Sequence, residues 1–382
     1  MTEACGDFDT VVIGGGITGL CASWFLARDG DAVACLDHGY DAGSTVNAGS
    51  LHVQMQSRLE RMFPGRVVDY ERGLPLYPLA VNTWEAVAAE LGNDIGLAVK
   101  GGLMVAETEQ DLVSLERKSA RERAHGVDTQ VISRRELRDV APYLDEELAG
   151  AAYCAREGKV DPLLANAAIR DRAISAGAIV VDGVRVDRLD CDKGRVRIEA
   201  GDARYTAGRV IVAAGAGSRA IAMTLGIDLP VIAEPLHMNV TEAAEPFMLH
   251  LVQHASRPIT MKQLGGGHVV IGGGWPAEAG LAPRVPAVSS GSLAGNLALA
   301  ARLVPGMAEF RVLRSWAGIN PTADLLSILG NVVTTPDVHF LVPGDAGYTL
   351  GPCLAQLLCE QLAGRDPGFP VAAFSPNRFA AA

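Results

Sequence analysis

A glycine-rich turn between two apolar segments is the feature that most constrains the fold of this chain. Residues 9–13 read as a short strand, Gly14 to Gly19 has the spacing G-x-G-x-x-G, and residues 20–29 read as a helix. A second predicted strand, residues 32–36, ends on Asp37. A strand, a glycine turn, a helix and an acidic residue in this order form a dinucleotide-binding fingerprint.

Each residue type in the fingerprint has a physical task. Gly14 permits the tight turn, Gly16 has no Cβ and lets a pyrophosphate approach the backbone, and Gly19 allows helix and strand to pack closely. The start of the helix offers unpaired N–H groups and a positive dipole end to the phosphates. Asp37 can accept hydrogen bonds from a ribose. We therefore expect a bound nucleotide cofactor, the alternative being a glycine-rich turn that binds nothing.

Length and composition restrict the class of protein. The 382 residues suggest two domains or one interleaved unit. Because 49% of the residues are apolar and 20% are charged, a large core can form. The net charge of −11 argues against a nucleic-acid-binding surface. No apolar run is long enough for a transmembrane helix, and the acidic start resembles no export signal, so we expect a cytoplasmic protein.

The cysteines predict neither a metal site nor a disulfide framework. None of the seven forms a C-x-x-C pair, and their number is odd. We therefore expect no metal ligands and no iron–sulfur cluster in this chain.

A second strand–glycine turn–helix pattern lies near the C-terminus. Residues 338–342 read as a strand, residues 344–352 as a glycine-containing turn, and residues 353–363 as a helix. Other apolar segments predict strands at 184–189, 203–206, 209–213 and 229–241, and a hairpin at 260–263 and 268–271. The segment 39–56 is rich in small residues with hydroxyl or amide groups, as suits a stretch that runs along a ligand.

Several separated motifs then agree in order. They are the N-terminal fingerprint, Asn47-Ala-Gly-Ser50, Val160-Asp-Pro162, Ala213-Ala-Gly-Ala216, Arg314-Ser-Trp-Ala-Gly318 with Asp324, and Gly347-Tyr-Thr-Leu-Gly-Pro352. Together they resemble the D-amino-acid oxidase superfamily of FAD-dependent oxidoreductases. The likeness is to the branch with glycine oxidase, sarcosine oxidase β-like subunits, and the β subunits of D-hydroxyproline, opine and cyanide-forming dehydrogenases.

This resemblance implies a mixed α/β fold. A Rossmann-like FAD-binding domain would be interleaved with a substrate domain built on a large mixed or antiparallel sheet. The expected FAD domain takes residues 1–60, 150–225 and 325–382, and the expected substrate domain takes residues 61–149 and 226–324.

The resemblance also implies which residues hold non-covalent FAD. The pyrophosphate and ribose of the adenosine would meet the fingerprint, the ribityl chain and flavin edge would meet the segment after it, and the flavin would meet the C-terminal turn. The implied residues are Gly14, Gly16, Ile17, Thr18, Gly19, Asp37, His38, Ser44, Thr45, Asn47, Ala48, Gly49, Ser50, Leu51, Val186, Ala214, Gly215, Gly344, Gly347, Tyr348, Thr349 and Leu350.

The implied activity is oxidation of a C–N bond in a small amine or amino acid that is glycine-, proline-, sarcosine- or opine-like. In this family a hydride passes to flavin N5 and the imine product hydrolyses in water. The protein mainly orients a neutral amine and excludes water. Candidate substrate contacts or catalytic residues are His52, His237, Lys262, Gln263, Trp316, Asn320 and Tyr348. Each has a structural alternative: a hydrogen-bonding core histidine, a solvated lysine, or core packing of Trp316 and Tyr348.

Three positions depart from the family pattern. Asn320 stands where relatives place an arginine that clamps the substrate carboxylate, so another cation serves or the substrate is not a simple α-amino acid. Ala317 stands where some sarcosine oxidases have a flavin-linking cysteine. Val270 matches, in a loose alignment, a lysine that promotes reaction with oxygen, so an acceptor other than oxygen is plausible.

Rival functions remain open at this point. The chain could be an electron-transferring or assembly subunit of a multi-subunit amine dehydrogenase, with partner chains that hold iron–sulfur clusters. It could be a silent FAD-binding subunit, which the intact flavin loops disfavour. NAD is the alternative cofactor, although the C-terminal turn then has no obvious task.

Overall fold

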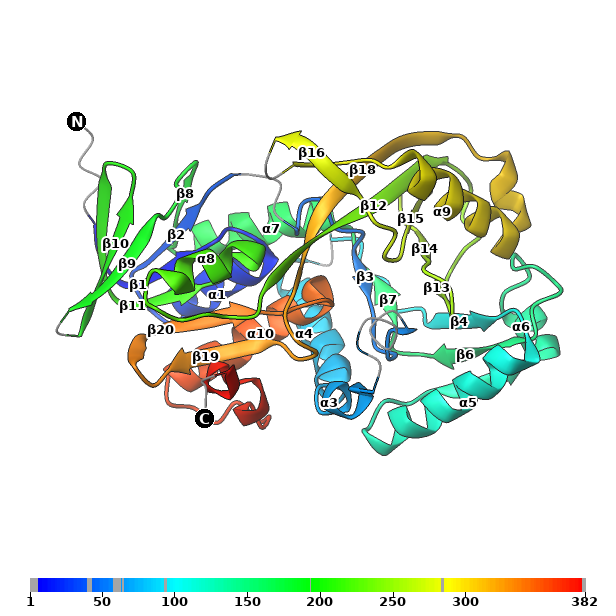
Figure 1. Ribbon diagram of the computed structural model, residues 1–382, viewed down its shortest axis with the longest axis horizontal. Coiled ribbons are helices and arrows are strands. Elements are labelled where there is room, and N and C mark those ends of the chain that lie inside the picture. The colour runs from blue at the N-terminus through cyan, green and yellow to red at the C-terminus, as the bar shows by residue number, and fades with distance from the viewer. Residues whose placement is uncertain are drawn as a thin grey trace. The chain divides into compact units, whose positions relative to one another are not determined.

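The chain divides into two units, each assembled from segments that are far apart in the sequence (Figure 1). The computed structural model describes residues 6–39, 43–57, 63, 65–92, 95–192, 194–282 and 285–379. The first unit comprises Met1–Thr45, Leu163–Glu234 and Ile319–Ala382, and the second comprises Val46–Pro162 and Pro235–Gly318. Within the described ranges, no helix has the length and apolar character needed to cross a bilayer.

The first unit is built on a largely parallel sheet. Its main path runs β19-β20-β11-β1-β2-β8, and only β19 pairs antiparallel along that path. Two further strands, β9 and β10, extend β11 as an antiparallel ribbon. The elements are β1 Asp7–Ile13, α1 Ile17–Arg28, β2 Val33–Asp37, α7 Pro162–Ser175, β8 Ile179–Asp182, β9 Arg188–Asp192, β10 Arg195–Ala200, β11 Ala203–Val212, α8 Ser218–Met223, β19 Ile328–Val332, β20 Thr335–Val342 and α10 Gly347–Leu362.

The inner segments of the central strands, such as residues 11–13 of β1 and 33–36 of β2, are apolar and buried, because both faces of the sheet are covered there. Val11 and Ile13 of β1 lie in a core cluster with Ile221 of α8. On the other face, Gly19 of α1 packs so closely that a Cβ there would lie 3.3 Å from Val12. This is the arrangement expected of a doubly covered parallel sheet, in which alternate residues of a strand point to opposite faces.

The second unit is built on an eight-stranded mixed sheet in the order β18-β12-β15-β14-β13-β4-β6-β5. Strands β13 and β4 are parallel, whereas β12–β15, β15–β14, β14–β13, β4–β6 and β6–β5 are antiparallel. The elements are β3 Ser50–Leu51, α3 Val67–Glu71, α4 Leu76–Glu90, β4 Gly102–Ala106, α5 Glu109–Ala124, β5 Gln130–Ser133, α6 Arg134–Val140, β6 Gly150–Cys154, β7 Gly158–Lys159, β12 Ile232–Ala243, β13 Leu251–His254, β14 Thr260–Gln263, β15 His268–Gly272, β16 Glu278–Ala282, β17 Val285–Ala287, α9 Ser290–Leu303 and β18 Val312–Thr322.

Different helices pack on the two faces of this second sheet. Met261 of β14 and Ile271 of β15 belong to a core cluster with Leu299 of α9. Met104 of β4, on the opposite face, packs with Leu115 of α5. In Figure 1, α9 and α5 lie on opposite sides of the strands of this unit. Because alternate residues of a strand point to opposite faces, the position of a residue along its strand tells which of these two faces it occupies.

The expected fold class is confirmed, with some element boundaries corrected. The predicted hairpin is present as β14 and β15. The predicted strands at 203–206 and 209–213 form one continuous strand, β11, and the strand expected at 184–189 begins only at Arg188. The last helix starts at Gly347 rather than 353 and contains Pro352, which has no N–H to donate to the carbonyl oxygen four residues earlier.

Candidate active site

The first glycine turn of the first unit is shaped by close backbone contacts. Gly14 has φ of 109°, a left-handed conformation that glycine adopts without strain. A Cβ on Gly14 would lie 2.5 Å from the carbonyl oxygen of Ala213, and a Cβ on Gly19 would lie 1.9 Å from the carbonyl oxygen of Gly14. Both glycines are therefore required for packing, whether or not a ligand is bound.

The start of α1 fits an anionic ligand. The backbone N–H of Ile17 donates to Ser44 Oγ at 2.8 Å. The first turn of α1 contains no acidic residue, and Gly16 contributes no capping side chain. The positive end of the helix dipole is thus not neutralised locally, as a pyrophosphate site requires.

Asp37 lies at the carboxyl end of β2, beside the glycine turn. Its Oδ1 accepts a hydrogen bond from the backbone N–H of Gly15 at 3.1 Å. Its Oδ2 accepts none from the described residues, which leaves an oxygen available for a ribose hydroxyl. The main-chain oxygen of Asp37 accepts from the backbone N–H of Val184, so the segment leading to Val186 starts beside this carboxylate.

The second glycine turn also lies in the first unit and connects β20 to α10. Gly344 has φ of 79°. A Cβ on Gly351 of α10 would lie 2.7 Å from Oγ1 of Thr18, so α10 and α1 cross at close range near their N-termini. Figure 1 shows α10 running next to α1. The two turns expected from the sequence to hold one cofactor therefore meet within one unit.

A third helix links these two turns. Asn166 of α7 donates from Nδ2 to the carbonyl oxygen of Ser44 at 3.0 Å. Its Oδ1 accepts from the hydroxyl of Tyr348 at 3.2 Å. Sequence reasoning missed Asn166, because nothing in the helical pattern of residues 162–175 separates it from a solvated amide.

The turn after β11 completes this edge of the sheet. Gly215 has φ of 53° and follows Ala214, while β11 lies between β1 and β20. Because β1, β2, β11 and β20 are parallel, their carboxyl ends meet at one edge, where open α/β sheets bind their ligands. Of the residues expected to hold FAD, those in the first unit are Gly14, Gly16, Ile17, Thr18, Gly19, Asp37, His38, Ser44, Thr45, Val186, Ala214, Gly215, Gly344, Gly347, Tyr348, Thr349 and Leu350.

The remaining expected cofactor residues, Asn47 to Leu51, lie in the second unit. Asn47 Oδ1 accepts from the backbone N–H of Gly49 at 2.8 Å, which closes an Asx turn. Gly49 has φ of 73°, and a Cβ there would lie 2.1 Å from the carbonyl oxygen of Val160. This close approach explains why the motifs Asn47-Ala-Gly-Ser50 and Val160-Asp-Pro162 occur together.

Lys262 is the most unusual predicted site residue in the second unit. Its side chain is fully buried, and its Nζ donates to Ser50 Oγ at 2.7 Å. Burial, with a smaller effect of the nearby positive charge of Lys159, lowers the pKa of Lys262 to about 7. The alternative of a solvent-facing lysine is wrong. Lys262 forms no ion pair with the described residues.

A second buried lysine lies next to this one. Lys159 of β7 stands opposite Ser50 of β3, and its Nζ donates to the carbonyl oxygens of Met248 and Leu249 at 3.3 Å each. Burial lowers the pKa of Lys159 to about 8. Sequence reasoning missed it, although its position directly before Val160-Asp-Pro162 was a usable signal.

His237 and Lys262 occupy opposite faces of the second sheet. Asn239 and Met261 both pair with Ile271, which places them on the face covered by α9, and His237 shares that face two residues before Asn239. Lys262 pairs with Val270 and points to the other face, toward Ser50. Lys262 is thus the direct cross-strand neighbour of Val270, the position where the resemblance implies a lysine in some relatives.

His237 belongs to a buried row of polar side chains. Its Nε2 contacts Asn239 Oδ1 at 3.0 Å, and Asn239 Nδ2 donates to Asn296 Oδ1 of α9 at 3.0 Å. Burial lowers the pKa of His237, which favours the neutral ring. Its Nδ1 has no hydrogen-bond partner among the described residues.

The other candidates have identified partners or positions. Asn320, in the first unit, donates from Nδ2 to Asp345 Oδ1 at 2.8 Å. Trp316, in the second unit, donates from Nε1 to the carbonyl oxygen of Val46 at 2.9 Å, and Gln263 Oε1 accepts from the backbone N–H of Phe247 at 2.8 Å. His52 is half-buried and directly follows β3.

Comparisons with known proteins agree with this geometry. The family model described as FAD dependent oxidoreductase matches residues 9–361. Glycine oxidase from Geobacillus kaustophilus is 28% identical, with 97% of each chain covered. The β subunit of sarcosine oxidase from Rhizobium meliloti is 24% identical, covering 97% of this chain and 88% of that one. The B subunit of opine oxidase from Agrobacterium tumefaciens is 24% identical, covering 98% of both.

A solved structure shows the same likeness in three dimensions. The crystal structure of glycine oxidase from Geobacillus kaustophilus matches with a TM-score of 0.84 and 25% identity, covering 97% of this chain and 99% of that one. The family model spans most of the sequence and includes both glycine turns. The chain therefore belongs to the family of FAD-dependent oxidoreductases, whose relatives named above are amino-acid and amine oxidases.

Proposed function

We propose that this chain oxidises the C–N bond of a small carboxylate-bearing amine that is glycine-, proline-, sarcosine- or opine-like. The first unit is the FAD domain and the second unit is the substrate domain. The observation that carries the proposal is Lys262, a wholly buried cation whose one hydrogen bond to a described residue goes to Ser50. When bound, FAD supplies the acceptor, at flavin N5, for a hydride from the carbon that bears the amine.

Lys262 and Lys159 give the second unit a positive interior. Both are buried, and among the described residues they donate to a hydroxyl and to carbonyl oxygens rather than to a carboxylate. An isolated buried cation is costly in free energy. A substrate carboxylate would offset that cost. Lys159 would then be the other cation that serves where Asn320 replaces the family's arginine, the alternative being a substrate that is not a simple α-amino acid. Asn320 itself is engaged with Asp345.

Lys262 also has a role in proton balance. An amine gives up a hydride only when its nitrogen is neutral, so a proton must leave the substrate ammonium. With a pKa lowered to about 7, Lys262 can be neutral near physiological pH and can hold that proton at Nζ.

The first unit holds the cofactor without a covalent bond. The start of α1 receives the pyrophosphate, Asp37 receives the ribose of the adenosine, and the start of α10 receives the flavin. Ala317 has no nucleophilic side chain and cannot link a flavin. The dipole of α10, a 16-residue helix, favours negative charge at its N-terminus.

A second proposal concerns assembly. Two of the relatives named above are called subunits of sarcosine oxidase and opine oxidase. We propose that this chain is the catalytic flavoprotein subunit of a multi-subunit enzyme, with partners that hold iron–sulfur clusters. Size-exclusion chromatography of the chain co-expressed with the products of neighbouring genes tests this: one co-eluting complex is expected, and elution of the flavoprotein by itself would contradict it.

An anaerobic spectroscopic screen tests the catalytic proposal. The purified chain is mixed with glycine, sarcosine, proline and an opine, and bleaching of the flavin band is followed. We expect at least one amine to bleach the flavin, Lys262→Met to slow bleaching at least tenfold, and the control Lys100→Met, at an exposed lysine, to have no effect. Bleaching by NADH and by no amine would show a reductase instead.

A further inference from the structure

Two buried carboxylates hold the segment that follows β3 in the second unit. We name residues 53–55 the strap. Glu157 is fully buried, and its Oε1 accepts from the backbone N–H groups of Val53 and Gln54 at 2.9 and 3.0 Å. Glu122 of α5, also fully buried, accepts from the backbone N–H of Met55 at 2.6 Å. Three successive backbone amides of the strap are thus bound by carboxylates.

Side-chain amides complete the surroundings of Glu157. Gln54 Nε2 donates to Oε2 at 3.0 Å, and Gln253 Nε2 lies 3.1 and 3.0 Å from the two oxygens. Among the described residues, every hydrogen-bond partner of the carboxylate is therefore a donor. Two of these donors are backbone N–H groups, which cannot act as acceptors instead. Burial raises the pKa of Glu157, and the hydrogen bonds from Val53 and Gln54 oppose that rise.

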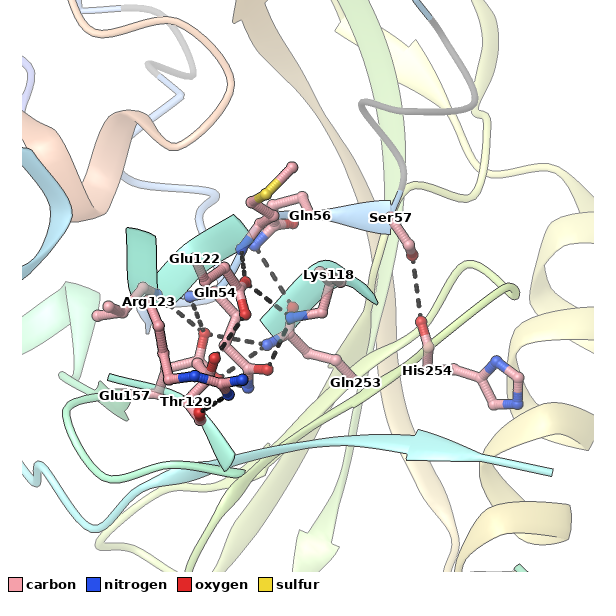
Figure 2. A network of polar contacts seen from close by, with 12 residues as sticks. Gln54, Gln56, Ser57, Lys118, Glu122, Arg123, Thr129, Glu157, Gln253 and His254 are labelled. Carbon is pink, nitrogen blue, oxygen red and sulfur yellow. Dashed lines mark hydrogen bonds and ion pairs between the residues drawn. The ribbon is translucent and has the colours of Figure 1, made fainter. Parts of the chain in front are cut away.

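Figure 2 shows how the two carboxylates are arranged around the strap. Glu122 and Glu157 approach Gln54 from different elements, and Lys118 of α5 extends toward Glu122 and Gln54. Lys118 Nζ donates to Glu122 Oε1 at 2.7 Å and to Gln54 Oε1 at 3.0 Å. The partners of Glu122 thus include a cation, whereas the partners of Glu157 are all neutral N–H groups.

The position of Glu157 is fixed from both sides. A Cβ on Gly102 of β4 would lie 1.9 Å from Glu157 Oε2, and a Cβ on Gly158 would lie 2.5 Å from the carbonyl oxygen of Ala98. The carboxylate therefore sits directly on the backbone of the second sheet.

The strap continues directly from the residues of the proposed site. Ser50 pairs with Lys159 and Leu51 with Gly158, so β7, which begins right after Glu157, holds β3 by backbone hydrogen bonds. His52 lies between β3 and the strap, and Ser50 is the hydrogen-bond partner of Lys262. Glu157 and the two residues after it therefore hold the whole segment 50–54.

We propose that Glu157 is a positioning residue for amine oxidation, which fixes the strap and, through it, the place of His52 and of Ser50 beneath Lys262. This inference rests on the proposed function. The proposal has a chemical consequence: the position requires a carboxylate, which accepts hydrogen bonds with both oxygens. A glutamine here would place its NH2 group next to N–H donors, and the backbone N–H groups among them cannot become acceptors.

The variant Glu157→Gln tests the proposal in the FAD-loaded protein. Hydrogen exchange of the peptide covering residues 50–57 should accelerate at least tenfold at Val53 and Gln54. Anaerobic flavin reduction by the best amine should slow at least tenfold. The matched control is Glu71→Gln, which removes a buried carboxylate that pairs with Arg121 and does not touch the strap; both readouts should stay within twofold of wild type.

A double-mutant cycle separates positioning from a purely structural role. If Glu157 acts through Ser50, then Ser50→Ala should reduce the rate much less in the Glu157→Gln background than in wild type. Should Glu157→Gln fail to fold, Gln253→Met removes one donor from the far side of the carboxylate and should shift both readouts in the same direction by a smaller factor.

Two results would overturn the inference. One is wild-type exchange at Val53 and Gln54 in Glu157→Gln. The other is faster exchange with an unchanged reduction rate and additive effects with Ser50→Ala, which would make the strap merely structural. Hydrogen exchange is measured without substrate, so it tests the positioning claim independently of the proposed function. The proposed function would fail in a different way, namely if no amine bleached the flavin of the wild-type protein.

Discussion

Asn166 is hydrogen-bonded to both sides of the proposed cofactor site: its Nδ2 donates to the carbonyl oxygen of Ser44 at 3.0 Å, and its Oδ1 accepts from the hydroxyl of Tyr348 at 3.2 Å. Ser44 in turn receives the first backbone N–H of α1. One amide side chain thus joins the glycine turn at residues 14–19 to the turn at residues 344–352. Tyr348, a candidate for substrate contact, has its hydroxyl engaged in this link.

Removing this link should weaken FAD binding. Asn166→Ala deletes two hydrogen bonds, each contributing about 0.5–1.5 kcal/mol, so we expect the dissociation constant of FAD to rise roughly tenfold. Titration of the apoprotein, followed by quenching of flavin fluorescence, measures it. The control Asp171→Asn changes an exposed residue of the same helix, α7. Equal affinities in both variants would contradict a bridging role for Asn166.

A side chain at Gly19 should prevent formation of the first turn. Its Cβ would lie 1.9 Å from the carbonyl oxygen of Gly14, and neither backbone can yield. Overpacking of this kind costs about 1–3 kcal/mol or more. We expect Gly19→Ala to lower the melting temperature and to purify without flavin. Gly306→Ala, where the added Cβ has open space, should keep both. A yellow, stable Gly19→Ala protein would refute the close approach.

Lys262 should make stability depend on pH in a defined direction. Its pKa is about 7 in the folded protein and near 10.5 in the unfolded chain, so between these values the unfolded chain binds more protons. The contribution of Lys262 to the free energy of unfolding therefore rises with pH from about 7 to about 10. Lys262→Met should stabilise the protein most at pH 6.5 and progressively less toward pH 9.5. Urea unfolding at these two pH values measures the difference, and a constant difference would contradict a depressed pKa.

The same residue should shape the pH profile of catalysis. If Lys262 holds the substrate proton, the rate of anaerobic flavin reduction should rise with pH through an inflection near 7, since only the neutral amine can accept a proton. Lys262→Met should lose this inflection as well as rate. Persistence of the inflection in that variant would assign it to the substrate or to another group.

The cofactor should be released when the protein is denatured. Ala317 offers no nucleophile at the position where some relatives carry a flavin-linking cysteine, so acid precipitation should leave the yellow colour in the supernatant. Flavin that stays in the pellet would show a covalent link through another residue.

Much of the first unit could be predicted from sequence because its signals are local. A strand, a glycine turn and a helix occur within about thirty residues. Gly14 has the positive φ expected of the turn, and Asp37 lies beside that turn, where it accepts a hydrogen bond from Gly15. The hairpin at β14 and β15 was equally accessible, since a turn and two apolar runs define it. Local patterns of this kind need no knowledge of distant contacts.

The polar interior of the second unit could not be predicted in the same way. Whether Lys262 is buried depends on Ser50, more than two hundred residues earlier in the chain. Glu157 looks in the sequence like an ordinary surface glutamate, and only the strap around Val53 and Gln54 makes it a buried acceptor. His237 and Lys262 looked alike as polar residues in apolar strands, and the register of β12, β15 and β14 assigns them to opposite faces.

The most direct measurement is anaerobic titration of the purified yellow protein with a panel of small amines and amino acids while its visible spectrum is recorded. We expect the flavin band to bleach stoichiometrically with at least one carboxylate-bearing amine and to persist with the corresponding carboxylate lacking nitrogen. A protein that binds FAD and is reduced by dithionite, yet is bleached by none of these amines, would contradict the proposed function.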